Sequence, residues 1–291
     1  MKTFKRILFS ILHIAAAFAI MLIAQLLGAA ASSLFSVNAI IDDLTYSAVY
    51  ICISLLLGYI YSKYILRIDF SVIGISKNPP RPYWLVIALI LPLSITAFYL
   101  LFTEGIFVKT DYTTFLPALF NTLIPAGLVA GFCEEFIFRG LMLRGLERLL
   151  NKTVAILAPS ILFAAAHVIM IIDSVAVTDI FLLLVSGTAV GIMFSLIAIA
   201  SGTVWASAIV HALWNAIIIG GVFVIEAPQY GTMASSFYRY DLSSDSLLLT
   251  GGAFGIESAL PAIIGYLSVS VIVLFRMKKK RNAFMQPRPN L

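Results

Sequence analysis

The sequence of 291 residues is too apolar for a water-soluble protein: 61% of its residues are hydrophobic and 11% are charged, against roughly a quarter charged in an ordinary soluble domain. Basic residues beside the apolar stretches account for the net charge of +5, so no nucleic acid partner is expected. The two cysteines, Cys52 and Cys133, lie within apolar stretches and are expected to remain free as small apolar side chains.

Eight stretches along the chain are long and apolar enough to cross a bilayer as helices, which takes about 20 residues each. The first lacks a clear cleavage site, which predicts a retained helix rather than a removed signal peptide. In chain order the stretches lie near residues 7–33, 44–62, 84–103, 115–138, 153–172, 180–200, 203–225 and 257–275. The sequence therefore predicts an all-α fold, a polytopic transmembrane helix bundle that forms one membrane domain over residues 1–291.

The basic residues predict the orientation of this bundle, because Lys and Arg in short loops are held on the cytoplasmic side. With eight spans both termini share one side, and that side collects 17 of the 19 Lys and Arg residues. Both termini are therefore expected to be cytoplasmic, with residues 277–291 as a basic cytoplasmic tail. The short loops and the lack of an organelle signal favour a bacterial cytoplasmic membrane.

Four ionisable side chains lie well inside the predicted spans in the middle of the sequence. Span four contains Glu134 and Glu135, span five contains His167, and span seven contains His211. Each such group costs several kcal/mol in a bilayer, so it is expected to face the interior of the bundle and to have a function. His13, in span one near its cytoplasmic end, has no such companions and is expected to be structural or interfacial.

Helix geometry predicts that three of these groups meet. Spans four and five form a hairpin that turns near Asn151; Glu134 and Glu135 precede this turn by 17 and 16 residues, and His167 follows it by 16. Residues equidistant from a turn lie at the same depth, here about 25 Å from it at 1.5 Å per residue. His211 is about ten residues from its own cytoplasmic turn, roughly 15 Å along its helix. It lies at the depth of the other three residues only if the hairpin of spans four and five projects beyond the bilayer on the cytoplasmic side.

Spacing within span four distinguishes its two carboxylates. Glu135 and Arg139 are four residues apart and therefore lie on one face of the helix, where they can form an ion pair. Glu134 points about 100° away and is left without a local partner. It is the better candidate for a general base that takes a proton from water.

Three short patterns in this region occur in order on separate predicted helices: EExxxR at 134–139, FxxxH at 163–167 and HxxxN at 211–215. Together they resemble the three motifs of the CPBP family, which comprises type II CAAX prenyl proteases and bacterial relatives described as immunity or abortive-infection proteins. The resemblance covers roughly residues 116–224, the motif-bearing core.

This resemblance implies an intramembrane peptidase. Glu134 would activate water with the assistance of His167, while His211 and Asn215 would stabilise the oxyanion. The other motif residues would support the site: Glu135, Arg139 and Phe163. The resemblance also allows a second chemistry, in which Glu134, His167 and His211 bind a zinc ion that lowers the pKa of its water towards about 7.

Two other classes of function are also compatible with the sequence. The carboxylates and histidines could form a proton or cation relay in a transporter, although no inverted repeat accompanies them. A membrane scaffold or immunity factor could keep the fold and act by binding alone. The peptidase hypothesis leads because the candidate base, both histidines and the Asn occur together, and its expected substrate is a hydrophobic or membrane-attached peptide.

Overall fold

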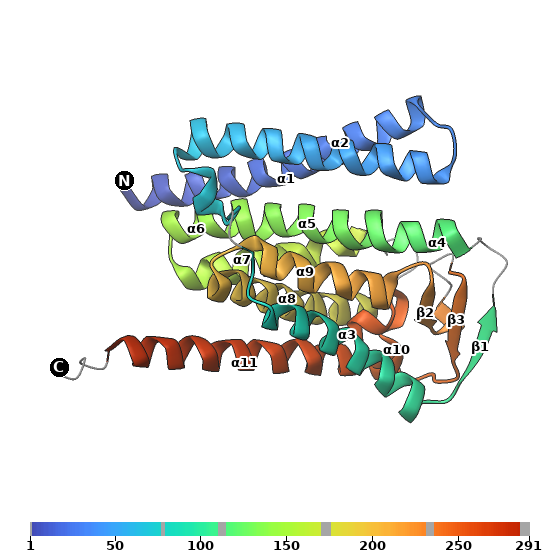
Figure 1. Ribbon diagram of the computed structural model, residues 1–291. Helices are drawn as coiled ribbons and strands as arrows, with labels where there is room; N and C mark the ends of the chain where they lie inside the picture. Colours follow the sequence, from blue (N-terminus) through green and yellow to red (C-terminus); the bar gives the residue numbers. More distant parts are fainter. Residues whose placement is uncertain (1, 77–78, 110–114, 170–175, 231–235, 286–291) are drawn as a thin grey trace.

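The computed structural model describes residues 2–76, 79–109, 115–169, 176–230 and 236–285. They form a bundle of long helices with a small sheet at one end, and the beginning of the first helix and the end of the last lie at the opposite end (Figure 1). Six helices in the described residues are long and apolar enough to cross a membrane. The chain is thus a multi-pass membrane protein, whereas the count of eight spans and the orientation of the termini remain predictions.

The N-terminal part is a helical hairpin along one side of the bundle (Figure 1). Helix α1 (Lys2–Leu34) and helix α2 (Ala39–Ile60) are separated by Asn38, whose side chain accepts a hydrogen bond from the Ile41 N–H and caps α2. A π-helical turn, η1 (Tyr61–Leu66), extends α2. Many large apolar side chains of this hairpin are exposed, as expected of surfaces that face lipid.

Helix α8 (Val177–Ser201) is the central helix of the bundle. In its most apolar window 61% of the residues are buried, against 17 to 33% in the other five long helices. It packs against α7 (Lys152–Val168) and α11 (Leu260–Met285), while α3 (Tyr83–Phe102) packs against α9 (Val204–Trp214). The side chains from residue 280 and all of residues 286–291, which include part of the predicted basic tail, lie outside the described residues.

The predicted fourth span is a 35-residue helix with two π-helical segments. Pro125 lies inside the first of these segments and has no backbone N–H to donate. π-Helical turns widen a helix locally and are common at functional sites, and here they flank a short α-helix that carries both candidate carboxylates. The helix consists of α4 (Phe115–Asn121), η3 (Thr122–Val129), α5 (Ala130–Glu135), η4 (Phe136–Met142) and α6 (Leu143–Leu149).

Two predicted spans are shorter than expected. Helix α7 begins after Asn151, whose side chain accepts from the Val154 N–H and makes the predicted turn. Helix α9 begins after Thr203 and continues as the π-helical η6 (Asn215–Ile219). The chain then becomes extended at Gly220, so the prediction of one helix to residue 225 is wrong at its end.

A three-stranded sheet is the element that the sequence did not predict. Strand β3 (Tyr238–Leu242) pairs antiparallel with β1 (Gly105–Lys109) and parallel with β2 (Phe223–Glu226). The strands come from distant parts of the chain, so pairing depends on the packing of the helices that bring them together. The remaining short helices are η2 (Phe70–Ile73), η7 (Pro228–Tyr230), α10 (Leu247–Thr250), η8 (Gly252–Phe254) and η9 (Ile256–Ser258).

Candidate active site

A cavity of about 340 Å³ lies within the bundle, and five of the predicted site residues line it: the supporting residue Phe163 and the four predicted catalytic residues, Glu134, His167, His211 and Asn215. They come from α5, α7, α9 and η6. Gly131 of α5 permits the closest of these helix contacts, because a Cβ atom there would lie 2.8 Å from the backbone nitrogen of Ala212. The missing side chain lets α9 approach α5 and brings His211 beside both carboxylates.

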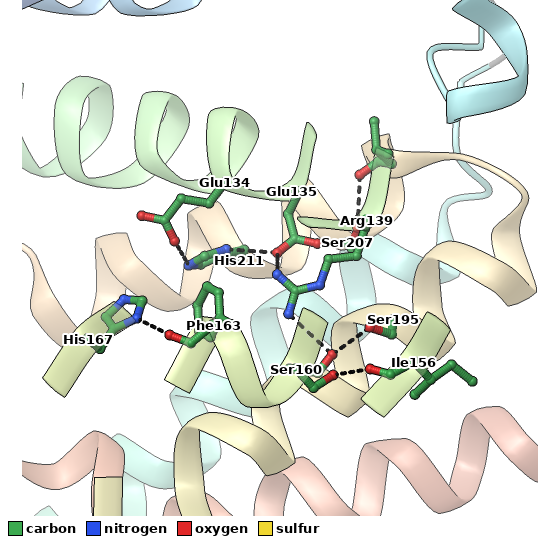
Figure 2. A network of polar contacts seen from close by, with 12 residues as sticks. Glu134, Glu135, Arg139, Ile156, Ser160, Phe163, His167, Ser195, Ser207 and His211 are labelled. Atoms are coloured by element: carbon green, nitrogen blue, oxygen red, sulfur yellow. Dashed lines mark hydrogen bonds and ion pairs between the residues drawn. The ribbon is translucent and has the colours of Figure 1, made fainter. Parts of the chain in front are cut away.

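Glu135 forms the buried ion pair expected from its spacing with Arg139. Its Oε1 accepts a hydrogen bond from Arg139 Nη1 at 2.7 Å, and both side chains are 0% exposed. The same oxygen lies 3.2 Å from Nδ1 of His211. Glu135 therefore links the guanidinium to the histidine of the third motif (Figure 2), and it does not line the cavity.

Arg139 is enclosed by aromatic rings as well as by its carboxylate. Its guanidinium carbon lies 4.8 Å from the ring centre of Phe163 and 5.2 Å from that of Phe194, distances at which a cation is attracted to a ring face. Nη2 donates to the carbonyl of Gly191 on α8. This residue thus joins the broken helix to α7 and α8, and Phe163 of the FxxxH motif is one of its contacts.

Glu134 differs from its neighbour because its carboxylate borders the cavity. The side chain is 20% exposed, and Oε2 lies 4.0 Å from Nε2 of His211. Oε2 is buried and makes no hydrogen bond within the described residues. A buried carboxylate oxygen without a donor is costly, so this atom is in a position where a water or a substrate group would be bound.

The two histidines of the cavity are held by one ring nitrogen each. Nδ1 of His167 lies 2.8 Å from the carbonyl oxygen of Phe163, and Nδ1 of His211 faces Glu135. His211 also stacks on Phe194, with ring centres 4.7 Å apart. Because a carbonyl oxygen can only accept a hydrogen bond, Nδ1 of His167 is the nitrogen that carries the hydrogen, and in the neutral ring Nε2 is an acceptor.

Asn215 lines the cavity through the first turn of η6. Its amide Nδ2 donates to the carbonyl of Ala126 in η3 at 2.9 Å. An amide nitrogen carries two hydrogens, so one remains after this contact. The hydrogen bond to the π-helical segment fixes the orientation of the amide.

Residues 116–217 match a family model described as type II CAAX prenyl endopeptidase Rce1-like. This segment of the chain is therefore similar to the Rce1-like family. Neither the curated proteins nor the solved structures gave a match.

The Rce1-like segment contains all three motifs and ends in η6. The family is described as one of endopeptidases, and the six apolar helices are those of a multi-pass membrane protein. The first three helices, the sheet and α11 lie outside the matched residues.

The predicted zinc ligands of the Rce1-like segment do not fit a metal ion in this arrangement. In a zinc site three protein atoms converge at about 2.0–2.2 Å on one point. Within the described residues no group of three His, Cys, Asp or Glu side chains is placed to do so. The side chains Glu134, His167 and His211 share the cavity but do not form such a group.

One polar residue of the cavity lies outside the Rce1-like segment and was not predicted. Glu257 of η9 lines the cavity, and its Oε2 accepts a hydrogen bond from Nε1 of Trp214 at 2.9 Å. The hydroxyl of Tyr266 donates to its backbone carbonyl. Burial raises the pKa of the Glu257 carboxyl, and the hydrogen bond from Trp214 opposes this shift. Its position at the first residue of a predicted span resembled an ordinary helix flank.

His13 is buried away from the cavity. Its Nδ1 lies 2.8 Å from the hydroxyl of Tyr61, and its Nε2 lies 3.1 Å from the carbonyl of Leu141. Both ring nitrogens are thus engaged, and they tie α1 to η1 and η4. This environment agrees with the structural role expected from the sequence.

Proposed function

We propose that this protein is an intramembrane endopeptidase that hydrolyses a peptide bond of a hydrophobic or membrane-attached substrate with water activated by Glu134. The observation that carries the proposal is the Glu134 carboxylate, which borders the cavity, makes no hydrogen bond within the described residues and lies 4.0 Å from Nε2 of His211. The Rce1-like family match supports the same class of reaction.

In the proposed reaction, Glu134 accepts a proton from a water molecule, and the resulting hydroxide attacks the carbonyl carbon of the substrate. His167 assists through Nε2, since its Nδ1 is held by Phe163. General base catalysis of this kind contributes about 10²–10⁴-fold to a rate. The proton on Glu134 then passes to the leaving nitrogen as the C–N bond breaks.

Charge on the oxygen of the tetrahedral intermediate would be stabilised from the opposite side of the cavity. Nδ1 of His211 is held by Glu135, and a protonated Nε2 would donate to the oxyanion. The free N–H of Asn215 would supply a second donor. Fixed donors aimed at a developing oxyanion are worth about 2.7–4 kcal/mol each, and Arg139 would hold Glu135 in place for this purpose.

The proposal is tested with purified protein in liposomes and a library of quenched fluorescent peptides. Wild type should cut members of the library, while Glu134→Gln and His167→Ala should be folded and at least about 100-fold slower. Glu147→Gln, which removes a half-exposed carboxylate from the pair with Arg144, is the matched control and should keep wild-type rates. Cleavage by Glu134→Gln at the wild-type rate, or no cleavage by wild type, would overturn the proposal and favour a binding role.

A further inference from the structure

One wall of the cavity is built by residues that follow the Rce1-like segment. It comprises the end of strand β2, the segment 252–257 and Tyr266. Gly252 has a φ of +66°, and a Cβ atom there would lie 2.1 Å from Oδ1 of Asp179 on α8. The glycine allows this segment to pack tightly on α8, which places Phe254 near His167 and brings Glu257 into the wall.

The charges of the cavity are of one sign. Carboxyl groups line it at Glu134, Glu226 and Glu257, and no Lys or Arg is among the described lining residues. Arg139, which does not line the cavity, is paired with Glu135. A bound group therefore meets carboxyl oxygens, two imidazoles and an apolar surface.

Glu257 is the carboxyl with the clearest orientation toward a ligand. Its Oε2 is held by Trp214, in the same motif helix as His211. Its Oε1 makes no hydrogen bond within the described residues and is not among the atoms shut off from the cavity. The carboxyl is thus fixed at one oxygen and open at the other.

We propose that Glu257 determines substrate specificity, so that the cavity selects peptide segments with a cationic or uncharged residue next to the cut and rejects those with a free carboxylate there. The inference rests on the proposed peptidase function and names its substrate class. A bound ammonium or guanidinium would compensate the buried carboxyl, since opposite charges at short range in a low dielectric attract strongly.

The same electrostatics bear on the substrate that the family description suggests. A CAAX motif ends at the C-terminus of its protein, so cleavage after the modified cysteine leaves a short peptide whose free carboxylate must lie close to the site. In this cavity such a carboxylate would approach Glu257, and the described lining residues include no Lys or Arg to pair with it. The geometry points to internal segments of membrane proteins as substrates.

The test uses the library peptide that wild type cuts fastest, resynthesised with Lys, Gln or Glu at each of the three positions after the cut, and with a free or amidated C-terminus. At the position nearest Glu257, kcat/KM for the Lys peptide should exceed that for the Glu peptide by at least about tenfold. This ratio corresponds to a difference of about 1.36 kcal/mol in activation free energy. Glu257→Gln, which keeps an acceptor for Trp214, should reduce that ratio about tenfold, while Glu147→Gln should leave it unchanged.

Failure of this inference differs from failure of the proposed function. Cleavage of Glu and free-carboxylate peptides as fast as the Lys peptide, or an unchanged ratio in Glu257→Gln, would overturn the specificity role while the peptidase function stands. Should wild type cut nothing, labelled library peptides that differ only by Lys or Glu at one position are used instead, and their binding to Glu134→Gln in lipid nanodiscs is measured. Tighter binding of the Lys peptide, lost on adding Glu257→Gln, would support the inference without turnover, and equal binding would overturn it.

Discussion

The two faces of the broken helix 115–149 contrast in how they treat a carboxylate. On the cavity face, Glu134 is partly exposed and makes no hydrogen bond within the described residues. About 100° round the helix, Glu135 is fully buried; its Oε1 contacts both Arg139 and His211, while its Oε2 makes no hydrogen bond within the described residues. The two residues are adjacent in sequence, so the difference comes from the helices packed on each face.

This contrast distinguishes a carboxylate that can take part in the reaction, Glu134, from one that holds other residues in place, Glu135. A carboxylate that already contacts a cation and a histidine is held in a fixed position, which suits a residue that orients others. A carboxylate that lacks donors and borders a cavity can exchange a proton with water. The first arrangement predicts large effects on stability, and the second predicts large effects on rate.

The largest expected effect is on the cavity face. Glu134→Gln should lower the cleavage rate by about 10²–10⁴-fold and leave the thermal unfolding midpoint within a few degrees of wild type, because the carboxylate has no hydrogen bond to lose. Cleavage of the best library peptide and unfolding in detergent measure the two quantities on one preparation. A variant that unfolds early would show that Glu134 is structural, like its neighbour.

Substitutions at the buried pair of Glu135 and Arg139 should lower the free energy of unfolding. Arg139→Met leaves Glu135 buried without its cation, and breaking a buried pair in this way costs about 3–5 kcal/mol. Arg144→Met is the matched control, since Arg144 forms a partly exposed pair with Glu147 that contributes about 1 kcal/mol or less. Thermal unfolding of both variants gives the difference, and equal midpoints would show that the buried pair does not hold the two helices together.

The sequence predicted the parts of this site that depend on the cost of polar groups in a membrane. Glu134, His167 and His211 were identifiable because ionisable residues are rare in apolar spans, and Asn151 marked the turn between their helices. The π-helical segments around α5 were not predictable, since they arise from tertiary packing rather than from local preference. Glu257 was missed because an acidic residue at a span boundary looks like an ordinary flank.

A smaller effect is expected at the other buried histidine. His13 has both ring nitrogens engaged, by Tyr61 and by a backbone carbonyl, so His13→Leu should lower the free energy of unfolding by about 1–3 kcal/mol and leave the cleavage rate of the folded protein unchanged. His211→Leu provides the comparison, because it should lose activity. A loss of rate in folded His13→Leu would show that α1 influences the cavity.

The smallest effect is expected from metal removal. The described residues offer no group of three His, Cys, Asp or Glu side chains that could hold a metal ion. Dialysis against a strong chelator should therefore leave the cleavage rate within about twofold of the untreated protein, and elemental analysis should find well under one zinc per chain. Loss of activity on chelation that added zinc restores would show that the cavity closes around a metal, with Glu134 as a ligand rather than a base.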